Sequence, residues 1–165
     1  MIYRKFYTLA LFGHRDITNK QEVRKILYDY LKHKIKGQSV RVLIGTHGDF
    51  DRIALGVCKQ LKNEGYNIDI CVVFTSQKQL IKEMELDKYS NDYKNIETMM
   101  YEIEDMYYKR QIIVSNQKMI DDSDEIMVYY NGKQLFNNNG TYRIMQYAKR
   151  QNKRVININN LMKIN

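Results

Sequence analysis

Short apolar runs alternate with amphipathic segments along most of this 165-residue chain. The apolar runs are typical of buried strands, and the segments between them repeat apolar residues at helical spacing. Strands that alternate with helices over short links favour parallel pairing through right-handed crossovers. We therefore expect an α/β fold with a mostly parallel sheet of about five strands, at residues 7–12, 40–44, 68–74, 126–130 and 154–158.

Helices are expected between these strands, at residues 20–36, 51–63 and 140–150. Two further segments have a weaker pattern. The polar stretch 75–95 indicates a short helix near Gln77–Glu85 and then an exposed connection, which is either a lid over a strand end or a surface insertion. Residues 96–120 carry methionines and isoleucines at helical spacing, which predicts a helix broken near Arg110.

Length and composition limit the kind of protein. A chain of this length suits a single domain, which we place at residues 1–165. Cys58 and Cys71 are far apart in sequence, so we expect buried thiols in a reducing cytoplasm, no metal site and no cofactor. No apolar run approaches the length of a membrane span, so we expect no membrane partner. The net charge of +8 favours phosphate-bearing ligands, and residues 133–165 contain seven Lys or Arg and no Asp or Glu.

Residues 41–54 combine a short apolar strand, a glycine-rich turn and the start of a helix. Gly45 and Gly48 allow sharp turns and the close approach of a ligand. The first N–H groups of a helix have no partners within it, so they are suited to binding an anion. Asp49 is placed to cap this helix, and Asp51 falls in its first turn. A plain strand-to-helix connection explains the same residues, and both interpretations stay open.

Glycine-containing loops follow three of the expected strands. They comprise Gly13-His14-Arg15, the loop Gly45–Asp49, and the polar loop Asn131–Asn139, which closes with Gly140-Thr141. The carboxyl ends of parallel strands meet at one edge of a sheet, and ligands bind there in open α/β folds. The three loops therefore favour a phosphate-containing ligand, although none matches a Walker loop or the full dinucleotide fingerprint.

Longer patterns resemble the SLOG superfamily. They are Phe12-Gly13-His14-Arg15 after the first strand, the Gly45–Asp51 loop, and Asn116-x-x-Met119-x-Asp121-x-Ser123-Asp124 before a later strand. Proteins of this superfamily are Rossmann-like and include relatives of the Lonely Guy cytokinin-activating hydrolases and of the DNA-processing protein DprA. The resemblance covers nearly the whole chain and implies a Rossmann-like three-layer sandwich, a nucleotide-derived ligand at the strand ends and often a homodimer. The Met- and Tyr-rich segment 99–108 adds to the expectation of a dimer.

The chain departs from the hydrolases at the position of their glutamate. The Lonely Guy enzymes carry Pro-Gly-Gly-x-Gly-Thr-x-x-Glu, whereas the matching segment 136–144 has no proline and ends in Ile144. A carboxylate there would stabilise positive charge on the ribose as the base leaves, which isoleucine cannot do. Many relatives also carry an arginine just before the position of Asn116, where this chain has Ser115, and Arg110 lies upstream as a possible substitute.

We expect a protein that senses or sequesters a nucleotide or nucleotide-derived ligand, such as an ADP-ribose or cyclic nucleotide compound. One alternative is a hydrolase of nucleotide N-glycosidic bonds, with Asp51, Asp49 or His14 as its catalytic groups. The other is DprA-like binding of single-stranded DNA, which the positive charge suggests. The missing glutamate favours binding over turnover. The expected ligand-binding residues are Gly13, His14, Arg15, Gly45, Thr46, His47, Gly48, Asp49, Phe50, Asp51, Arg110, Asn116, Tyr130, Asn131, Gly140 and Thr141.

Overall fold

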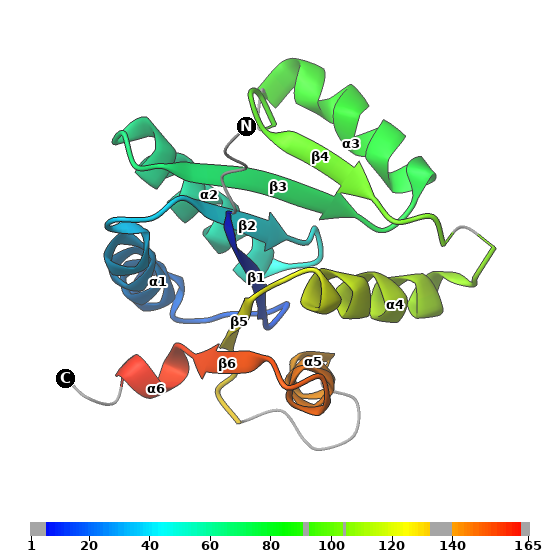
Figure 1. The fold of residues 1–165 in the computed structure, drawn as a ribbon. Coiled ribbons are helices and arrows are strands. Elements are labelled where there is room, and N and C mark those ends of the chain that lie inside the picture. The colour runs from blue at the N-terminus through cyan, green and yellow to red at the C-terminus, as the bar shows by residue number, and fades with distance from the viewer. Residues whose placement is uncertain (1–5, 91–92, 104, 133–139, 163–165) are drawn as a thin grey trace, which may run out of the picture.

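The computed structural model describes residues 6–90, 93–103, 105–132 and 140–162, which include one six-stranded parallel sheet (Figure 1). The strands are β1 (Tyr7–Gly13), β2 (Val40–Ile44), β3 (Ile68–Phe74), β4 (Glu97–Met100), β5 (Glu125–Tyr129) and β6 (Arg154–Asn157). Their order across the sheet is β4-β3-β2-β1-β5-β6, and every neighbouring pair is parallel. The expected α/β fold is confirmed, with one strand more than the sequence predicts.

Helices cover both faces of this sheet and complete a Rossmann-like sandwich (Figure 1). They are α1 (Lys20–Ile35), α2 (Asp49–Asn63), α3 (Gln77–Ser90), α4 (Tyr108–Asp121), α5 (Gly140–Arg150) and α6 (Asn159–Met162). Successive strand residues point to opposite faces. In β1, Leu9 and Leu11 pack with α1 and α2, whereas Ala10 and Phe12 pack on the face that α4 and α5 cover.

The single helix predicted at residues 96–120 is wrong. Glu97–Met100 forms the edge strand β4, which pairs with β3, and α4 begins only at Tyr108. Methionine has a high intrinsic helix propensity, so the spacing of the methionines indicates a helix. The open edge of β3 gives the backbone of these four residues hydrogen-bond partners, and this tertiary pairing overrides the local preference.

Two other elements differ from the expected ones, and one expected loop is largely untested. α2 begins at Asp49 rather than at Asp51, with Gly48 in the N-cap position. α3 continues to Ser90, so it takes up about half of residues 86–95, where an exposed connection was expected. Most of the polar loop Asn131–Asn139 lies outside the described residues.

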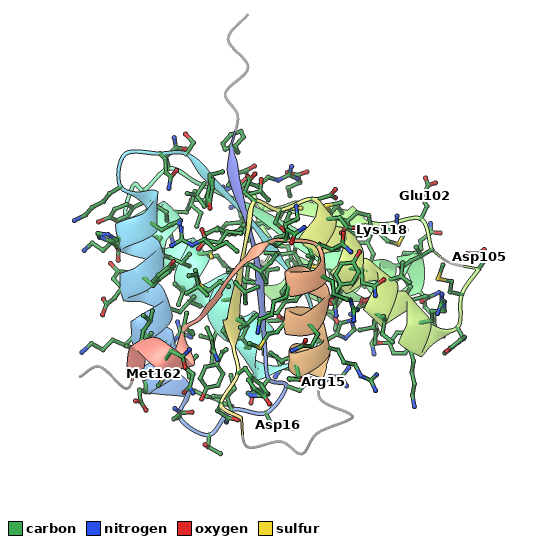
Figure 2. The ribbon with its side chains drawn as sticks, turned by 60° about the horizontal axis from the view of Figure 1, so that its bottom comes forward. Arg15, Asp16, Glu102, Asp105, Lys118 and Met162 are labelled. Atoms are coloured by element: carbon green, nitrogen blue, oxygen red, sulfur yellow. The ribbon has the colours of Figure 1, made fainter. Side chains whose placement is uncertain are left out.

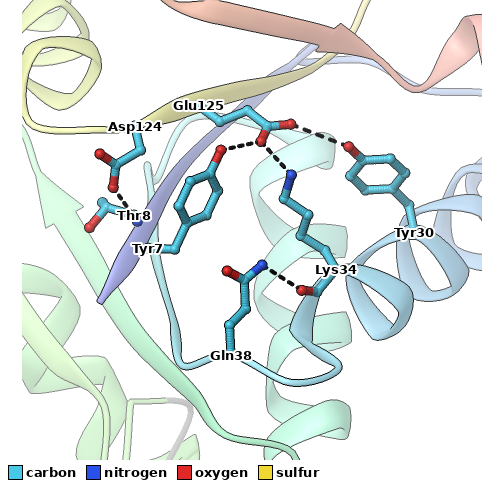
Figure 3. A network of polar contacts seen from close by, with 7 residues as sticks. All are labelled: Tyr7, Thr8, Tyr30, Lys34, Gln38, Asp124 and Glu125. Carbon is cyan, nitrogen blue, oxygen red and sulfur yellow. Dashed lines mark hydrogen bonds and ion pairs between the residues drawn. The ribbon is translucent and has the colours of Figure 1, made fainter. Parts of the chain in front are cut away.

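A buried charge network joins β1, β5 and α1 at the edge where the strands begin (Figure 3). The Glu125 carboxylate accepts hydrogen bonds from Lys34 Nζ and from the Tyr7 hydroxyl, both at 2.6 Å, and from the Tyr30 hydroxyl at 3.2 Å. Burial by itself raises the pKa of Glu125, but the bonds from Lys34 and Tyr7 outweigh it and hold this pKa below its ordinary value. The network holds these three elements together at the edge of the sheet opposite the carboxyl ends of the strands.

Neither a membrane span nor a metal centre is found in the part of the chain that the structure describes. No helix there is long and apolar enough to cross a membrane. The same residues contain no group of three His, Cys, Asp or Glu side chains that could hold a metal ion. Cys58 on α2 and Cys71 on β3 are buried free thiols, as expected from the sequence.

Candidate functional site

The order of the strands places a crevice at one edge of the sheet. β2, β3 and β4 lie on one side of β1, and β5 and β6 lie on the other. In open parallel sheets, ligands bind beyond the carboxyl ends of the strands, where the strand order reverses. Figure 2 shows Arg15 and Asp16 at this edge, just after β1. We call the loops at residues 13–16, 45–48, 75–76 and 130–131, together with the first turn of α2 at residues 49–51, the strand-end site.

The loop after β1 is fastened to the start of α2. The N–H of Asp49 donates to the Arg15 carbonyl at 2.7 Å, and the N–H of Phe50 donates to the His14 carbonyl at 3.3 Å. These two amides at the start of the helix, where an anion was expected, therefore already have partners within the chain. The prediction that Asp49 caps α2 is wrong, because its carboxylate reaches the N–H of Ile17 at 2.9 Å and Gly48 takes the cap position.

Two glycines allow these loops to pack closely. A Cβ on Gly13 would lie 2.2 Å from Cγ of the buried Phe50. A Cβ on Gly48 would lie 2.5 Å from Cα of Arg15, and the φ of 122° at Gly48 is one that L residues rarely adopt. Phe50 packs beneath the strand-end site. Both glycines allow one segment of the protein to lie close to another.

Arg15, His47 and Asp51 form a charged cluster within the strand-end site. The Asp51 carboxylate accepts the N–H of His47 at 2.7 Å and lies 3.1 Å from where a Cβ on Gly45 would be. Burial raises the pKa of Asp51 to about 6, although the His47 hydrogen bond and the positive Arg15 act in the opposite direction. Burial and Arg15 both lower the pKa of His47. Near pH 7 the cluster therefore combines a guanidinium, a neutral imidazole and a carboxyl that titrates close to neutrality.

The loop after β3 adds a polar wall to the strand-end site. His47 Nε2 and Thr75 Oγ1 are hydrogen-bonded at 2.6 Å, and Gln79 Nε2 donates to Thr46 Oγ1 at 2.7 Å. The N–H of Thr75 donates to Gln79 Oε1 at 2.9 Å. Thr75 and Gln79 are not among the residues that the sequence indicates. The one available signal is that Thr75 directly follows an apolar strand.

A broad cavity of about 1000 Å³ opens beside this polar wall. It lies between the starts of α3 and α4, and its lining includes Ser76, Gln79, Tyr108 and Gln111. The ring of Tyr108 meets His47 edge-on, with centroids 6.3 Å apart. The strand-end site therefore borders a space at the upper end of the size range of small-molecule sites.

His14 joins β1 to β5 at the base of the crevice. Its Nε2 accepts the N–H of Asn131 at 3.1 Å, which places the proton of the neutral ring on Nδ1. The rings of Tyr129 and Tyr130 pack against it, each with a centroid 5.6 Å away, and Tyr130 in turn contacts Tyr142 of α5. Burial lowers the pKa of His14, and the contact with Asn131 only partly opposes this. His14 is thus a neutral group that holds the loop after β5 in place.

The remaining expected residues lie along α4 and α5. Arg110 is exposed in the first turn of α4, and Thr141 is buried at the start of α5. Asn116 and Gly140 line a separate cavity of about 430 Å³ between these two helices. The structure therefore gathers the expected residues of the loops after β1, β2 and β5 at one edge and places these four on the helix pair.

Comparison with protein families agrees with this fold. The YpsA family model, described as the YspA SLOG family, matches residues 3–163. The chain belongs to this SLOG family. No curated protein matches the chain. Membership confirms the resemblance to the SLOG superfamily and indicates a function related to nucleotides.

The position of the hydrolase glutamate is apolar in this SLOG chain. Ile144, in the first half of α5, packs partly buried against the core that α4 and α5 cover. The strand-end site contributes the carboxylates of Asp49 and Asp51. Asp49 accepts the bond from Ile17 and lies 3.5 Å from Lys20 Nζ, and both contacts help to lower its pKa. Asp51 is therefore the carboxyl of the pair whose pKa lies in the range useful for proton transfer.

Proposed function

We propose that this chain binds a nucleotide-derived ligand, such as an ADP-ribose or cyclic nucleotide compound, at the strand-end site and senses or sequesters it. The observation that carries the proposal is the cluster of Arg15, His47 and Asp51 beside the reversal of strand order. A guanidinium suits phosphate oxygens, and the hydroxyl and amide groups of the polar wall suit ribose hydroxyls. Membership of a SLOG family supports the same class of ligand.

Binding without turnover is favoured by the groups at the expected catalytic positions. Ile144 offers no charge to stabilise a cationic ribose in a transition state. His14 uses Nε2 to accept the N–H of Asn131, so this nitrogen already has a partner within the protein. Asp49 is tied to the loop that contains Ile17. These contacts support a protein that holds its ligand intact.

The test is thermal melting with ADP-ribose, AMP and cyclic AMP, followed by mass spectrometry of the recovered ligand. A ligand that binds only the folded chain raises the melting temperature. Arg15→Gln removes the guanidinium of the cluster, so we expect it to lower the affinity for the ligand by about ten-fold or more. Lys36→Gln is the control, because it removes an exposed cation at the other edge of the sheet. The proposal fails if none of the three ligands raises the melting temperature, or if both variants weaken binding equally.

Asp51 supports a second candidate, hydrolysis of a nucleotide N-glycosidic bond. Its pKa of about 6 lets the carboxyl exchange a proton near neutral pH. In this reaction water adds to the anomeric carbon of the ribose, the C–N bond breaks and the base leaves with a proton. Free base should then accumulate from AMP with the wild-type chain and not with Asp51→Asn. AMP that is recovered intact after long incubation at high protein concentration rules this candidate out.

A further inference from the structure

The cavity between the starts of α3 and α4 adjoins the strand-end site. Gln79 lines this cavity, and its side-chain amide also bonds to Thr46 Oγ1 and to the N–H of Thr75, at 2.7 and 2.9 Å. Tyr108 lines the cavity from α4, and its ring meets the ring of His47 edge-on. A ligand that is held at the charged cluster therefore lies next to this cavity, and a long ligand extends into it.

The cavity has room for a second part of such a ligand. Its volume of about 1000 Å³ is at the upper end of the range of roughly 300–1000 Å³ that is common for whole small-molecule sites. None of the residues of the charged cluster, Arg15, His47 and Asp51, lines it. A mononucleotide therefore fills only a part of the space that the cluster and the cavity offer together.

Two exposed side chains supply the apolar lining of the cavity. Tyr108 of α4 is 54% exposed, and Ile81 of α3 is 53% exposed. Aromatic side chains favour other flat rings in offset-stacked or edge-to-face contact. Tyr107 precedes Tyr108 and is 71% exposed, but it is not among the residues that line the cavity. The lining thus suits a nucleobase, and Tyr108 rather than Tyr107 is placed to contact it.

The polar lining suits the other parts of a nucleotide. Lys78 and Lys82 line the cavity and are four residues apart on α3, so they lie on one face of this helix. They outnumber the carboxylate of Glu83 among the described lining residues, so the charge of the lining is positive. Ammonium groups bind phosphate oxygens, and the hydroxyl of Ser76, which also lines the cavity, suits a ribose hydroxyl.

We propose that the ligand of the strand-end site is a dinucleotide, in which phosphate groups join two nucleosides. One nucleoside lies at the strand-end loops, and the phosphates lie between Arg15 and the two lysines of α3. The second base packs on Tyr108 in the α3–α4 cavity. This inference rests on the function proposed above and narrows its class of ligand, because a mononucleotide leaves the cavity unfilled.

The test compares diadenosine pyrophosphate with ADP by calorimetric titration of the full chain. ADP has the same two phosphates and more negative charge but no second nucleoside, so positive charge alone favours ADP. We expect diadenosine pyrophosphate to bind about five-fold more tightly or better, because stacking of a base on an aromatic side chain contributes on that scale. Its NMR spectrum should also show shifts of α3 amides that ADP does not cause.

Variants of the two neighbouring tyrosines test the place of the second base. Tyr108→Ala should abolish the preference for diadenosine pyrophosphate and leave the affinity for ADP within about two-fold, because only the second base contacts this ring. Tyr108→Phe keeps the ring and should keep the preference. Tyr107→Ala is the matched control, since it removes an exposed tyrosine outside the cavity, and it should also keep the preference.

The remaining outcomes separate this inference from the proposed function. If ADP binds and Arg15→Gln weakens it, but diadenosine pyrophosphate binds no more tightly, the inference is overturned and the proposed function stands. A preference that survives Tyr108→Ala, or that Tyr107→Ala removes equally, also overturns the inference. If neither compound binds, the proposed function fails and the inference fails with it.

Discussion

Gly48 adopts a φ of 122° and lies against the backbone of Arg15, so two separate costs oppose a side chain there. Gly48→Ala introduces both a strained backbone and a Cβ only 2.5 Å from Arg15 Cα. Gly37 also has a positive φ, of 81°, but a Cβ there meets nothing within 4 Å. We expect Gly37→Ala to cost about 1 kcal/mol of unfolding free energy and Gly48→Ala at least about 2–3 kcal/mol, measured by urea denaturation. Equal costs would show that the contact with Arg15 does not matter.

The Asp51 carboxyl makes the protein less stable as the pH rises, which is an unusual direction for a carboxyl. Its folded pKa of about 6 lies above the ordinary 3.8, so its favourable contribution is present below pH 4 and is lost as the pH rises through 6. Asp51→Asn should therefore match the wild type near pH 4 and be more stable at pH 8, by up to about 3 kcal/mol. Urea denaturation at both pH values measures this difference.

Asp49→Asn is the matched variant, and we expect it to change the stability at high pH in the opposite direction. The hydrogen bond from Ile17 and the charge of Lys20 lower the pKa of Asp49. Its contribution to stability is therefore present when the pH is above the ordinary pKa of an aspartate, and it is lost as the pH falls. Asp49→Asn should be less stable than the wild type at pH 8. If Asp51→Asn also loses stability at pH 8, the Asp51 carboxyl is not destabilised by burial.

The sequence predicts residues of the strand-end site only where the local pattern of one loop identifies them. Glycines and polar residues directly after apolar runs identify Arg15, His47 and Asp51, because a chain must turn where a buried strand ends. The bonds of Thr75 and Gln79 to the neighbouring loop depend on β2 lying beside β3. That adjacency is a property of the whole sheet, so the position of Thr75 directly after a strand does not by itself indicate these bonds, and no local pattern indicates Gln79.

The elements themselves follow from the sequence where the apolar pattern is long. The strands in the centre of the sheet are buried on both faces, which gives continuous apolar runs such as Ile70–Phe74. β4 is four residues long and only partly buried, so it has no such run. Its strand conformation depends on the edge of β3, and the local sequence of Glu97–Met100 is compatible with a helix.

The Lys34–Glu125 ion pair should couple α1 to β5 energetically. Its nitrogen and oxygen are 2.6 Å apart, and the Glu125 side chain is fully buried. Lys34→Met leaves a buried carboxylate without its cation, so we expect a loss of about 3 kcal/mol. Glu125→Gln in the same chain removes the uncompensated charge, so the double variant should lose less than the sum of the single variants. A double-mutant cycle by urea denaturation measures this coupling.

A surface pair provides the control for that cycle. Arg41 and Glu97 are also close, at 2.9 Å, but their side chains are 31% and 49% exposed. Exposed pairs couple by less than about 1 kcal/mol, so the cycle of Arg41→Met with Glu97→Gln should give a smaller value. If the two cycles give equal coupling, burial of Glu125 has no part in its stabilising effect.

At the scale of the whole molecule, exposed aromatic side chains gather at the start of α4. Tyr107 and Tyr108 are 71% and 54% exposed. Large exposed apolar side chains that cluster in this way mark contact surfaces. Met99 and Met100, which first suggested a dimer as part of a helix, lie in β4, so the two tyrosines now carry the expectation.

Charges of both signs flank these tyrosines. Lys109 and Arg110 follow them on α4, and Glu102 and Asp105 lie on the loop before them (Figure 2). In a two-fold interface the same patch meets itself, so the carboxylates of one copy can lie against the cations of the other. We propose that the chain forms a homodimer through the start of α4, where charges of both signs allow this patch to face the same patch of a second copy.

Light scattering after size-exclusion chromatography tests this dimer. The wild-type chain should elute with twice its mass of 19.8 kDa, and Tyr107→Glu with Tyr108→Glu should elute as the monomer, because a carboxylate replaces each apolar contact. Phe6→Glu is the control, since Phe6 is exposed where β1 begins, at the other edge of the sheet. Raising the salt concentration should weaken the wild-type dimer by screening the flanking charges. A monomeric wild-type chain, or a dimer that Phe6→Glu dissociates equally, would place the interface elsewhere or remove it.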